Sequence, residues 1–431
     1  MAEATARQPR GLSALFLTEM WERFSYYGMR AMIVLYLTGA IGWSQPRASL
    51  LYGAYTTSVW FTPIIGGWLA DRYLGAQRAL LIGGTIIACG HFVLAIETMP
   101  TFYLGLTLVA LGTGLFKPNV SACVGELYEP GDPRRDPGFT IFYMGINLGA
   151  LIGPLVTGWL RVNYGWRYGF AAAGVGMILA VVVLLATRKT LLGEAGLYPG
   201  AKRAVKEHDT AAGPLTRDEW ERVIALAVVS FFVIFFWGAY EQAGNTMNYF
   251  AAHSTKLDLG WIKVVPEWFQ SVDPVFIILL GPVFAVLWTW LARAGKEPST
   301  TRKMALGLIV MGLGFVFMVA AAAQVKAGGL ASPIWLVLAF MFHATGELCL
   351  SPVGLSLVTK VAPGKIVSLM MGVWFLSNAA GNFVAGLLGA MTEKIPDPVT
   401  FWTIFLAFPV AAGVILFILA PKLQKLMHGR G

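Results

Sequence analysis

EMWERFSYYGMR, from Glu19 to Arg30, lies inside an apolar run that is long enough to cross a bilayer. It carries two carboxylates, two guanidinium groups and two tyrosines within twelve residues. At about 100° per residue, the charged side chains and Tyr26 fall within one arc of about 100° on a helix. One face of this helix is therefore charged, while its other faces suit lipid or packing.

The composition of the whole chain indicates a membrane protein. Of 431 residues, 57% are hydrophobic and 13% are charged, and the mean hydropathy is +0.66. Soluble chains carry about a quarter charged residues, and apolar runs of about 18 or more residues predict membrane-spanning helices. We expect twelve such helices, near residues 12–38, 49–70, 77–97, 101–128, 138–161, 167–187, 220–251, 271–292, 304–325, 332–358, 366–391 and 399–420.

The distribution of Lys and Arg predicts the orientation. If the N-terminus is cytoplasmic, the inner segments hold 22 of these residues and the outer loops hold 7. This asymmetry places both termini in the cytoplasm and accounts for the net charge of +9 without a nucleic-acid partner. The first apolar run is too long for a cleavable signal peptide. Cys89, Cys123 and Cys349 fall in three different spans, so we expect small core residues, not disulfides or metal ligands.

A long polar segment, residues 188–219, divides the chain into an N-terminal bundle, 1–187, and a C-terminal bundle, 220–431, with six spans each. It holds no apolar run that would form an extra central helix pair. A faint repeat supports two related halves, since WLADR at 68–72 and WLARA at 290–294 close corresponding spans. Parallel repeats of this kind are typical of transporters, whose substrate site lies at the interface of the repeats.

Several charges fall deep within predicted spans. Three cations lie there, Arg23, Arg30 and Lys117. A rise of about 1.5 Å per residue places carboxylates at similar depths. A charge at the bilayer centre costs upwards of about 2.5 kcal/mol, so such charges usually pair or face a watery cavity. They could be structural ion pairs that fasten helices together, but convergence from both halves favours a central titratable site. The midplane set is Glu19, Glu22, Arg23, Lys117 and Glu347, and the outer pair is Arg30 with Glu241.

Five motifs carry a resemblance to a known family. ExxERFxYYG at 19–28 resembles the signature of the proton-dependent oligopeptide transporters, a branch of the major facilitator superfamily. FKPNVSACVGELY (116–128), FYMGINLGALIGPL (142–155) and GELCLSPVGLS (346–356) resemble that family's fourth, fifth and tenth helices, and GGWLADRYLGAQR (66–78) resembles a superfamily loop. The resemblance implies an all-α membrane protein with twelve helices in two six-helix halves, the major facilitator fold.

The resemblance also implies a function, which is proton-driven import of di- and tripeptides in the bacterial inner membrane. Protons would be the coupling ion with no other cofactor, and the partners would be small peptides and membrane lipid, with the protein acting as a monomer. Proton coupling would involve Glu19, Glu22, Arg23 and Lys117. Substrate binding would involve Arg30, Lys117, Glu347, Tyr26, Tyr27, Asn147, Trp374, Ser351 and Asn378, with Asp273 as a further candidate. Apart from the resemblance, Arg30 and Glu241 share a depth and come from opposite halves, so we expect them to act in gating by closing the outer gate.

Some alternatives stay open at the sequence level. Tyr26, Tyr27 and Trp374 could be plain core aromatics, and Asn147 could join helices, since Gly149 and Gly153 follow it at small-xxx-small spacing. Asp273 precedes a proline, so it could cap a helix instead of facing a pocket. The same scaffold could carry nitrate, a drug or a peptide-like conjugate, or sense peptides without transporting them. An enzyme is not expected, because HExxH and GxSxG patterns are absent.

Overall fold

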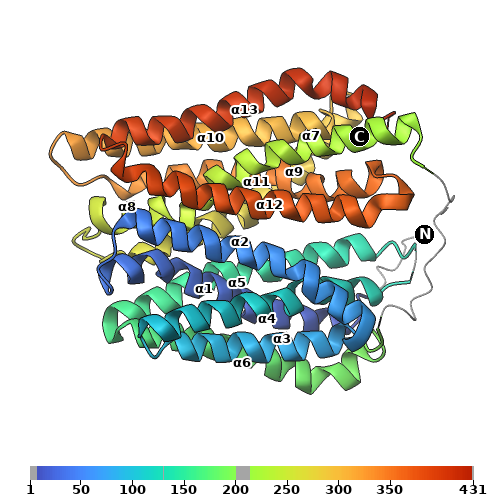
Figure 1. Ribbon diagram of the computed structural model, residues 1–431, viewed down its shortest axis with the longest axis horizontal. Coiled ribbons are helices and arrows are strands. Elements are labelled where there is room, and N and C mark those ends of the chain that lie inside the picture. The colour runs from blue at the N-terminus through green and yellow to red at the C-terminus, as the bar shows by residue number, and fades with distance from the viewer. Residues whose placement is uncertain (1–6, 130, 200–213, 430–431) are drawn as a thin grey trace. The chain divides into compact units, whose positions relative to one another are not determined.

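Long helices account for most of the computed structural model, which describes residues 7–129, 131–199 and 214–429 (Figure 1). Eleven of the twelve predicted spans each correspond to one long helix, and the seventh, 220–251, corresponds to α7 and the short α8. The helices are α1 (Gly11–Gly39), α2 (Gln45–Leu69), α3 (Ala76–Leu94), α4 (Met99–Glu126), α5 (Arg135–Tyr164), α6 (Trp166–Thr187), α7 (Arg217–Tyr240), α8 (Thr246–Ser254), α9 (Val272–Arg293), α10 (Thr300–Lys326), α11 (Pro333–Val361), α12 (Val367–Gly389) and α13 (Pro398–Leu426).

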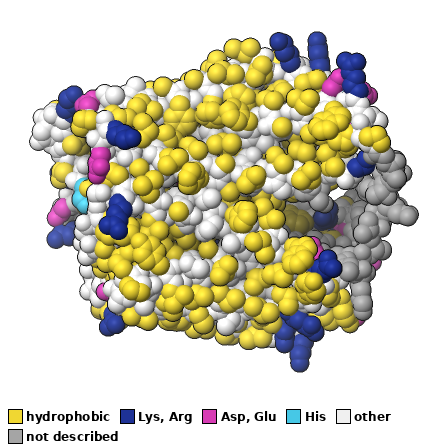
Figure 2. Space-filling view, in the orientation of Figure 1, with side chains coloured by type: hydrophobic (Ala, Val, Ile, Leu, Met, Phe, Trp, Pro, Cys, Tyr) yellow, Lys and Arg dark blue, Asp and Glu magenta, His cyan; other side chains and the backbone are white. Residues whose placement is uncertain are grey.

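Ten helical segments among the described residues are long and apolar enough to cross a membrane. The two long helices outside this set are α1, which carries four charged side chains, and α2, which is rich in Tyr, Thr and Ser. The polar side chains of α1 and α2 lower the hydropathy of these two helices, and α1 carries several of the predicted functional residues. Figure 2 shows hydrophobic side chains over the middle of one face, with Lys and Arg mostly toward its two ends.

The predicted seventh span, 220–251, is not one continuous helix. Helix α7 ends at Tyr240, the short 3₁₀-helix η4 (Glu241–Gly244) follows, and α8 begins at Thr246. The polar sequence EQAGN interrupts the helix, and the Gln242 side-chain amide donates to the backbone oxygens of Gly238 at 3.1 Å and Ala385 at 2.9 Å. The break places Glu241 at the start of η4, where its side chain is buried.

The chain divides into two compact units. Unit 1 comprises Met1–Ile33 and Ser58–Ala204, and unit 2 comprises Val34–Thr57 and Val205–Gly431. The end of α1 and the first half of α2 therefore group with unit 2. The boundaries 1–187 and 220–431 stay a prediction. Of the predicted linker, residues 200–213 lie outside the described residues, and the described part holds one helical turn, η2 (Arg188–Leu192), and no other helix before α7.

Small residues let helices approach closely within each unit. In unit 1, a Cβ added at Gly83 of α3 would lie 2.7 Å from the backbone oxygen of Gly112 on α4. In unit 2, a Cβ at Gly307 of α10 would lie 2.7 Å from the backbone oxygen of Gly346 on α11. Figure 1 shows α10 and α13 running side by side in unit 2. Such small-residue contacts are typical of membrane helix packing, in which backbones approach without a hydrophobic driving force.

The prediction that all three cysteines are core residues is wrong for one of them. Cys123 and Cys349 are buried, but Cys89 is exposed on α3. The sequence places Cys89 in an apolar span, yet an apolar span has a face that points outward to lipid. Burial in a membrane protein therefore cannot be inferred from the hydropathy of neighbouring residues alone.

Candidate functional site

The charged face of α1 forms a compact ion cluster in unit 1. Arg23 Nε lies 2.8 Å from Glu19 Oε1 and 2.6 Å from Glu22 Oε2. The exposed fractions of Glu19, Glu22 and Arg23 are 2%, 0% and 5%. The cluster thus holds two carboxylates against one guanidinium, away from solvent. Binding or release of one proton at a carboxyl group would change its charge balance.

Helix α5 fixes the position of α1 through a ladder of small residues. A Cβ at Gly149 would lie 2.2 Å from the backbone oxygen of Met20, and one at Gly153 would lie 2.5 Å from that of Phe24. One turn further on, the Thr157 hydroxyl donates to the Gly28 backbone oxygen at 3.1 Å. Steps of four residues on both helices keep the contact on one face of each. The GxxxG spacing on α5 therefore sets how deeply the ion cluster of α1 lies.

Two tyrosines accompany the guanidinium groups of α1. The Arg23 Cζ atom lies 5.6 Å from the ring centroid of Tyr26, and the Arg30 Cζ atom lies 5.3 Å from that of Tyr27. These distances fall within the range of cation–π interaction, which extends to about 6 Å. Tyr26 is 6% exposed, so it is a core aromatic that contacts the Arg23 guanidinium. A contact between Tyr26 and a peptide stays a prediction.

Lys117 of α4 has an aromatic neighbour that the sequence did not reveal. Its Nζ atom lies 3.3 Å from the ring centroid of Trp60 on α2. Two contacts in unit 1 set this register, since the Thr62 hydroxyl donates to the Ala110 backbone oxygen at 2.8 Å and Gly66 packs on Gly114. Trp60 lies 57 residues from Lys117, and nothing in the sequence alone pairs them.

In unit 2, one hydroxyl links two carboxylates. The Tyr240 hydroxyl lies 2.5 Å from Glu347 Oε2 and 2.8 Å from Asp273 Oδ2. These side chains come from α7, α11 and α9. The capping interpretation of Asp273 is wrong, because α9 begins at Val272 after Ser271 and the Asp273 carboxylate meets Tyr240 instead. Glu347, which was predicted from a motif, and Asp273, a further candidate, thus converge on a tyrosine that was not predicted.

Glu241 takes part in a second polar network of unit 2. Its Oε2 accepts a hydrogen bond from the Tyr52 hydroxyl at 2.9 Å. The Ser49 hydroxyl, one turn earlier on α2, donates to Asn245 Oδ1 at 2.6 Å. A Cβ at Gly53 would lie 2.6 Å from the Cα of Gly386 on α12, so this part of α2 lies directly against α12. These contacts explain why residues 34–57 group with unit 2.

The remaining predicted site residues are two asparagines, a tryptophan and a serine. The side-chain amides of Asn147 and Asn378 donate to backbone oxygens one turn earlier, at 3.0 and 2.9 Å. Trp374 is 6% exposed, and a Cβ at Gly354 would lie 2.3 Å from its ring, so it packs tightly on α11. The Ser351 hydroxyl has no hydrogen-bond partner among the described residues.

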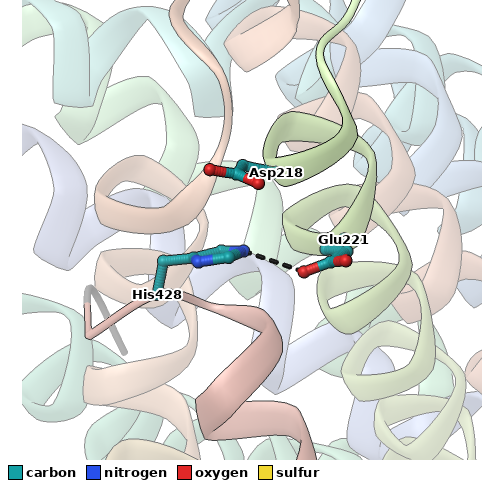
Figure 3. Close-up of side chains that lie close together, drawn as sticks. All are labelled: Asp218, Glu221 and His428. Carbon is teal, nitrogen blue, oxygen red and sulfur yellow. Dashed lines mark hydrogen bonds and ion pairs between the residues drawn. The ribbon is translucent and has the colours of Figure 1, made fainter.

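A further polar cluster lies at an end of unit 2 (Figure 3). His428 Nε2 lies 3.0 Å from Glu221 Oε2, and Asp218 is close to both. Arg217 also contacts Glu221, at 3.2 Å between Nε and Oε1. Asp218 and His428 are exposed, so these contacts form a solvated surface cluster. Exposed ion pairs of this kind contribute little to stability.

Comparison with known proteins decides the family. The family model described as "POT family" matches residues 77–192 and 207–403. The chain belongs to the POT family. A di-/tripeptide transporter of Lactococcus lactis subsp. cremoris is 33% identical, with 97% of each chain covered. An uncharacterized transporter of Bacillus subtilis (strain 168), YclF, is 39% identical over 98% of this chain and 95% of that protein.

A solved structure confirms the fold of this POT family member. The crystal structure of a peptide transporter POT in complex with sulfate superposes with a TM-score of 0.91 at 38% identity, covering 100% of this chain and 97% of that one. The chain is therefore an all-α, multi-pass membrane transporter with twelve membrane-spanning helices and the major facilitator fold. The resemblance that the five sequence motifs indicated is confirmed.

Proposed function

We propose that this POT family protein is a proton-coupled symporter that imports di- and tripeptides by alternating access. The ion cluster of α1 carries the proposal, because two carboxylates buried around Arg23 form a site whose charge one proton would change. The Lactococcus relative, which is named as a di-/tripeptide transporter, supports the substrate class. The coupling needs no cofactor other than the proton.

Coupling follows from competition for cations in unit 1. While both carboxylates of Glu19 and Glu22 are ionised, they hold Arg23. A proton on one of them would release part of the guanidinium's hydrogen-bonding capacity to a peptide carboxylate. Proton and peptide then both favour the state in which Arg23 is partly released from the carboxylates. By linkage, binding of each raises the affinity for the other. Lys117, half-buried against Trp60, would be a second cation for the peptide carboxylate.

The two ends of a peptide require opposite charges. Unit 1 carries Arg23, Arg30 and Lys117, and unit 2 carries Glu347 within its network. In our proposal the peptide carboxylate meets the cations and its ammonium meets Glu347. A carboxylate that accepts from an ammonium makes a charge-assisted hydrogen bond of about 1.5–3 kcal/mol, and Glu347 is half-buried. The proposed contacts to the rest of the peptide are those of Tyr26, Tyr27, Asn147, Trp374, Ser351 and Asn378.

The gating roles of Arg30 and Glu241 are also part of the proposal. Both side chains are buried, with 6% and 3% exposed. Glu241 accepts a hydrogen bond from Tyr52 of α2, so a change in the position of the Glu241 carboxylate would be transmitted to α2 within unit 2. Substitution Tyr52→Phe should alter the rate of transport more than peptide affinity, since it removes a gate contact and no proposed peptide contact. An unchanged maximal uptake rate for this variant would contradict the gate assignment.

The proposed setting is the bacterial inner membrane, with both termini in the cytoplasm and the protein acting as a monomer. A proton moving down about 100 mV supplies roughly 2.3 kcal/mol. At one proton per neutral peptide, the potential alone would support an accumulation of roughly fifty-fold. This driving force is sufficient for nutrient uptake from dilute solution.

Uptake into sealed vesicles separates this function from its alternatives. The protein is reconstituted into liposomes, and radiolabelled dialanine, nitrate and a peptide-like conjugate are compared under an inward proton gradient. We expect concentrative uptake of dialanine. Uptake of another solute with none of dialanine would identify a different cargo, and dialanine binding without uptake would identify a sensor.

A further inference from the structure

A groove at the start of α1 has the features of a lipid site. It encloses about 410 Å³ and lies in unit 1, at the first turn of α1 and the first turns of α5. Pro9, Leu12, Phe16 and Ile141 supply its apolar lining, and Arg10 stands at its rim. This volume falls within the range of ligand pockets, which is about 300–1,000 Å³. None of the side chains in the proposed transport site lines this groove.

The wall of the groove is held in place by hydrogen bonds. The Tyr128 hydroxyl donates to Gln8 Oε1 at 2.9 Å, and the Gln8 amide donates to the Arg134 backbone oxygen at 3.3 Å. Arg134 in turn donates to the Arg7 backbone oxygen at 2.9 Å. The segment that precedes α1 is therefore fastened to the α4–α5 loop, and the groove is a built feature of unit 1.

Two neighbouring cations differ in their availability to a ligand. The Arg134 guanidinium is committed to Asp132, with Nη2 at 2.7 Å from Oδ2, and it holds the pKa of that carboxyl below its usual range. Arg10 is exposed and makes no ion pair with any described residue. An anionic group at the rim of the groove would therefore form an ion pair with Arg10, because Arg134 is already paired with Asp132.

The groove lies where a membrane has its head groups. Helix α1 has 29 residues, so it is about 43 Å long and exceeds a hydrocarbon core of about 30 Å. Its first turn consequently lies in the interfacial region. Exposed Leu17 follows Ser13 by four residues on α1, and exposed Met144 follows Ile141 by three on α5. Each helix thus continues the apolar surface from the groove toward the bilayer core.

We propose that this groove binds an anionic phospholipid, with the head group on Arg10 and an acyl chain along Phe16 and Ile141. Charge complementarity selects the head group, since a Lys or Arg side chain near the membrane surface attracts anionic lipids. The lipid also bridges α1 to α5, next to the glycine ladder that sets the depth of the ion cluster. The proposal needs the membrane-spanning fold and the position of the groove, and it does not depend on which solute is transported.

Lipid retention by the purified full chain tests the proposal. Native mass spectrometry in detergent compares phosphatidylglycerol with phosphatidylcholine of the same acyl chains, for the unaltered protein and three variants. Arg10→Gln removes the rim cation, and Ile141→Trp fills the groove without a change of charge. Arg293→Gln removes a comparable exposed cation at the end of α9, which does not line the groove. Each variant is first shown to melt normally in phosphatidylcholine.

The proposal predicts a distinct result for each variant. Arg10→Gln should reduce the preference for phosphatidylglycerol about five-fold, the effect of one cation near a membrane surface. Ile141→Trp should reduce retention of both lipids at this site, and Arg293→Gln should leave the preference unchanged. Equal effects of Arg10→Gln and Arg293→Gln would overturn the proposal, because the preference would then be a general surface effect.

A soluble competitor separates a lipid from a free anion. We expect glycerol phosphate, which has no acyl chain, to leave phosphatidylglycerol bound at equal concentration. If it displaces the lipid completely, Arg10 forms a simple anion site and the lipid proposal is wrong. No peptide enters either assay, so a failure of peptide transport would leave these results standing, and a failure here would leave the transport proposal standing.

Discussion

Arg23 and Glu22, adjacent on α1, are joined by an ion pair of 2.6 Å with both side chains almost completely buried. Adjacent residues on a helix point about 100° apart, so this contact requires the long Arg23 side chain to turn back across the helix. Arg23 thereby reaches both Glu22 and, one turn earlier, Glu19. A guanidinium held by two carboxylates of its own helix can be released without movement of the backbone.

The glycine ladder makes a prediction about stability. Gly149→Ala should destabilise the protein by about 1–3 kcal/mol, the usual cost of overpacking, because the added Cβ would lie 2.2 Å from the Met20 backbone oxygen. Gly281→Ala on α9 is the control, since nothing lies within 4 Å of its added Cβ. We expect this control to be neutral or slightly stabilising. Equal melting temperatures for the two variants would contradict the account of how α1 is positioned.

The Tyr240 network makes a second prediction. Tyr240→Phe removes the hydroxyl that both Glu347 and Asp273 contact, so it should destabilise unit 2 by about 1–3 kcal/mol. Asp273→Asn should cost less, because the amide oxygen still accepts from Tyr240. The double variant should be less destabilised than the sum of the single ones, since the residues share one network. Strict additivity in thermal unfolding would show that the three groups act independently.

Glu347 is expected to bind the ammonium group at the amino end of a peptide. Glu347→Gln should weaken binding of a free dipeptide roughly ten- to a hundred-fold. It should scarcely change binding of the N-acetylated dipeptide, which has no ammonium. Calorimetry measures the affinity of the free and the N-acetylated dipeptide for the unaltered protein and for Glu347→Gln. If the substitution weakens both ligands equally, Glu347 does not recognise the amino terminus.

Trp60 is expected to position Lys117 for the peptide carboxylate. Trp60→Leu removes a cation–π contact of about 0.5–2 kcal/mol and should weaken a dipeptide about two- to thirty-fold. Trp60→Phe, which keeps an aromatic face, should have an intermediate effect. A dipeptide amide, which lacks the carboxylate, is the comparison ligand. If Trp60→Leu weakens the amide as much as the acid, Trp60 acts on packing and not through Lys117.

The sequence predicted features that depend on helix periodicity and local motifs. The twelve spans and the charged face of α1 follow from hydropathy and a repeat of 3.6 residues, and Glu19, Glu22 and Arg23 do converge. Contacts made by residues far apart in the chain could not be predicted in this way. Lys117 meets Trp60, and Glu347 meets Tyr240, through helix packing that no local pattern encodes.

One alternative and one prediction from local sequence patterns were wrong, because tertiary contacts decided the structure. Asp273 precedes a proline, which suits a helix cap, but α9 begins at Val272 and the carboxylate contacts Tyr240. The seventh span was expected to be continuous, because the hydropathy of residues 220–251 hides the interruption at EQAGN. There, Gln242 bonds the backbone of α12 and stabilises the turn.

Proton-driven exchange by the Glu22→Gln variant tests the central claim most directly. In proteoliposomes with an inward proton gradient, the unaltered protein should concentrate dialanine, and a protonophore should abolish the accumulation. Glu22→Gln mimics a permanently protonated carboxyl, so it should lose concentrative uptake while it still exchanges labelled for unlabelled dialanine across the membrane. Concentrative uptake by Glu22→Gln equal to that of the unaltered protein would contradict coupling through the ion cluster of α1.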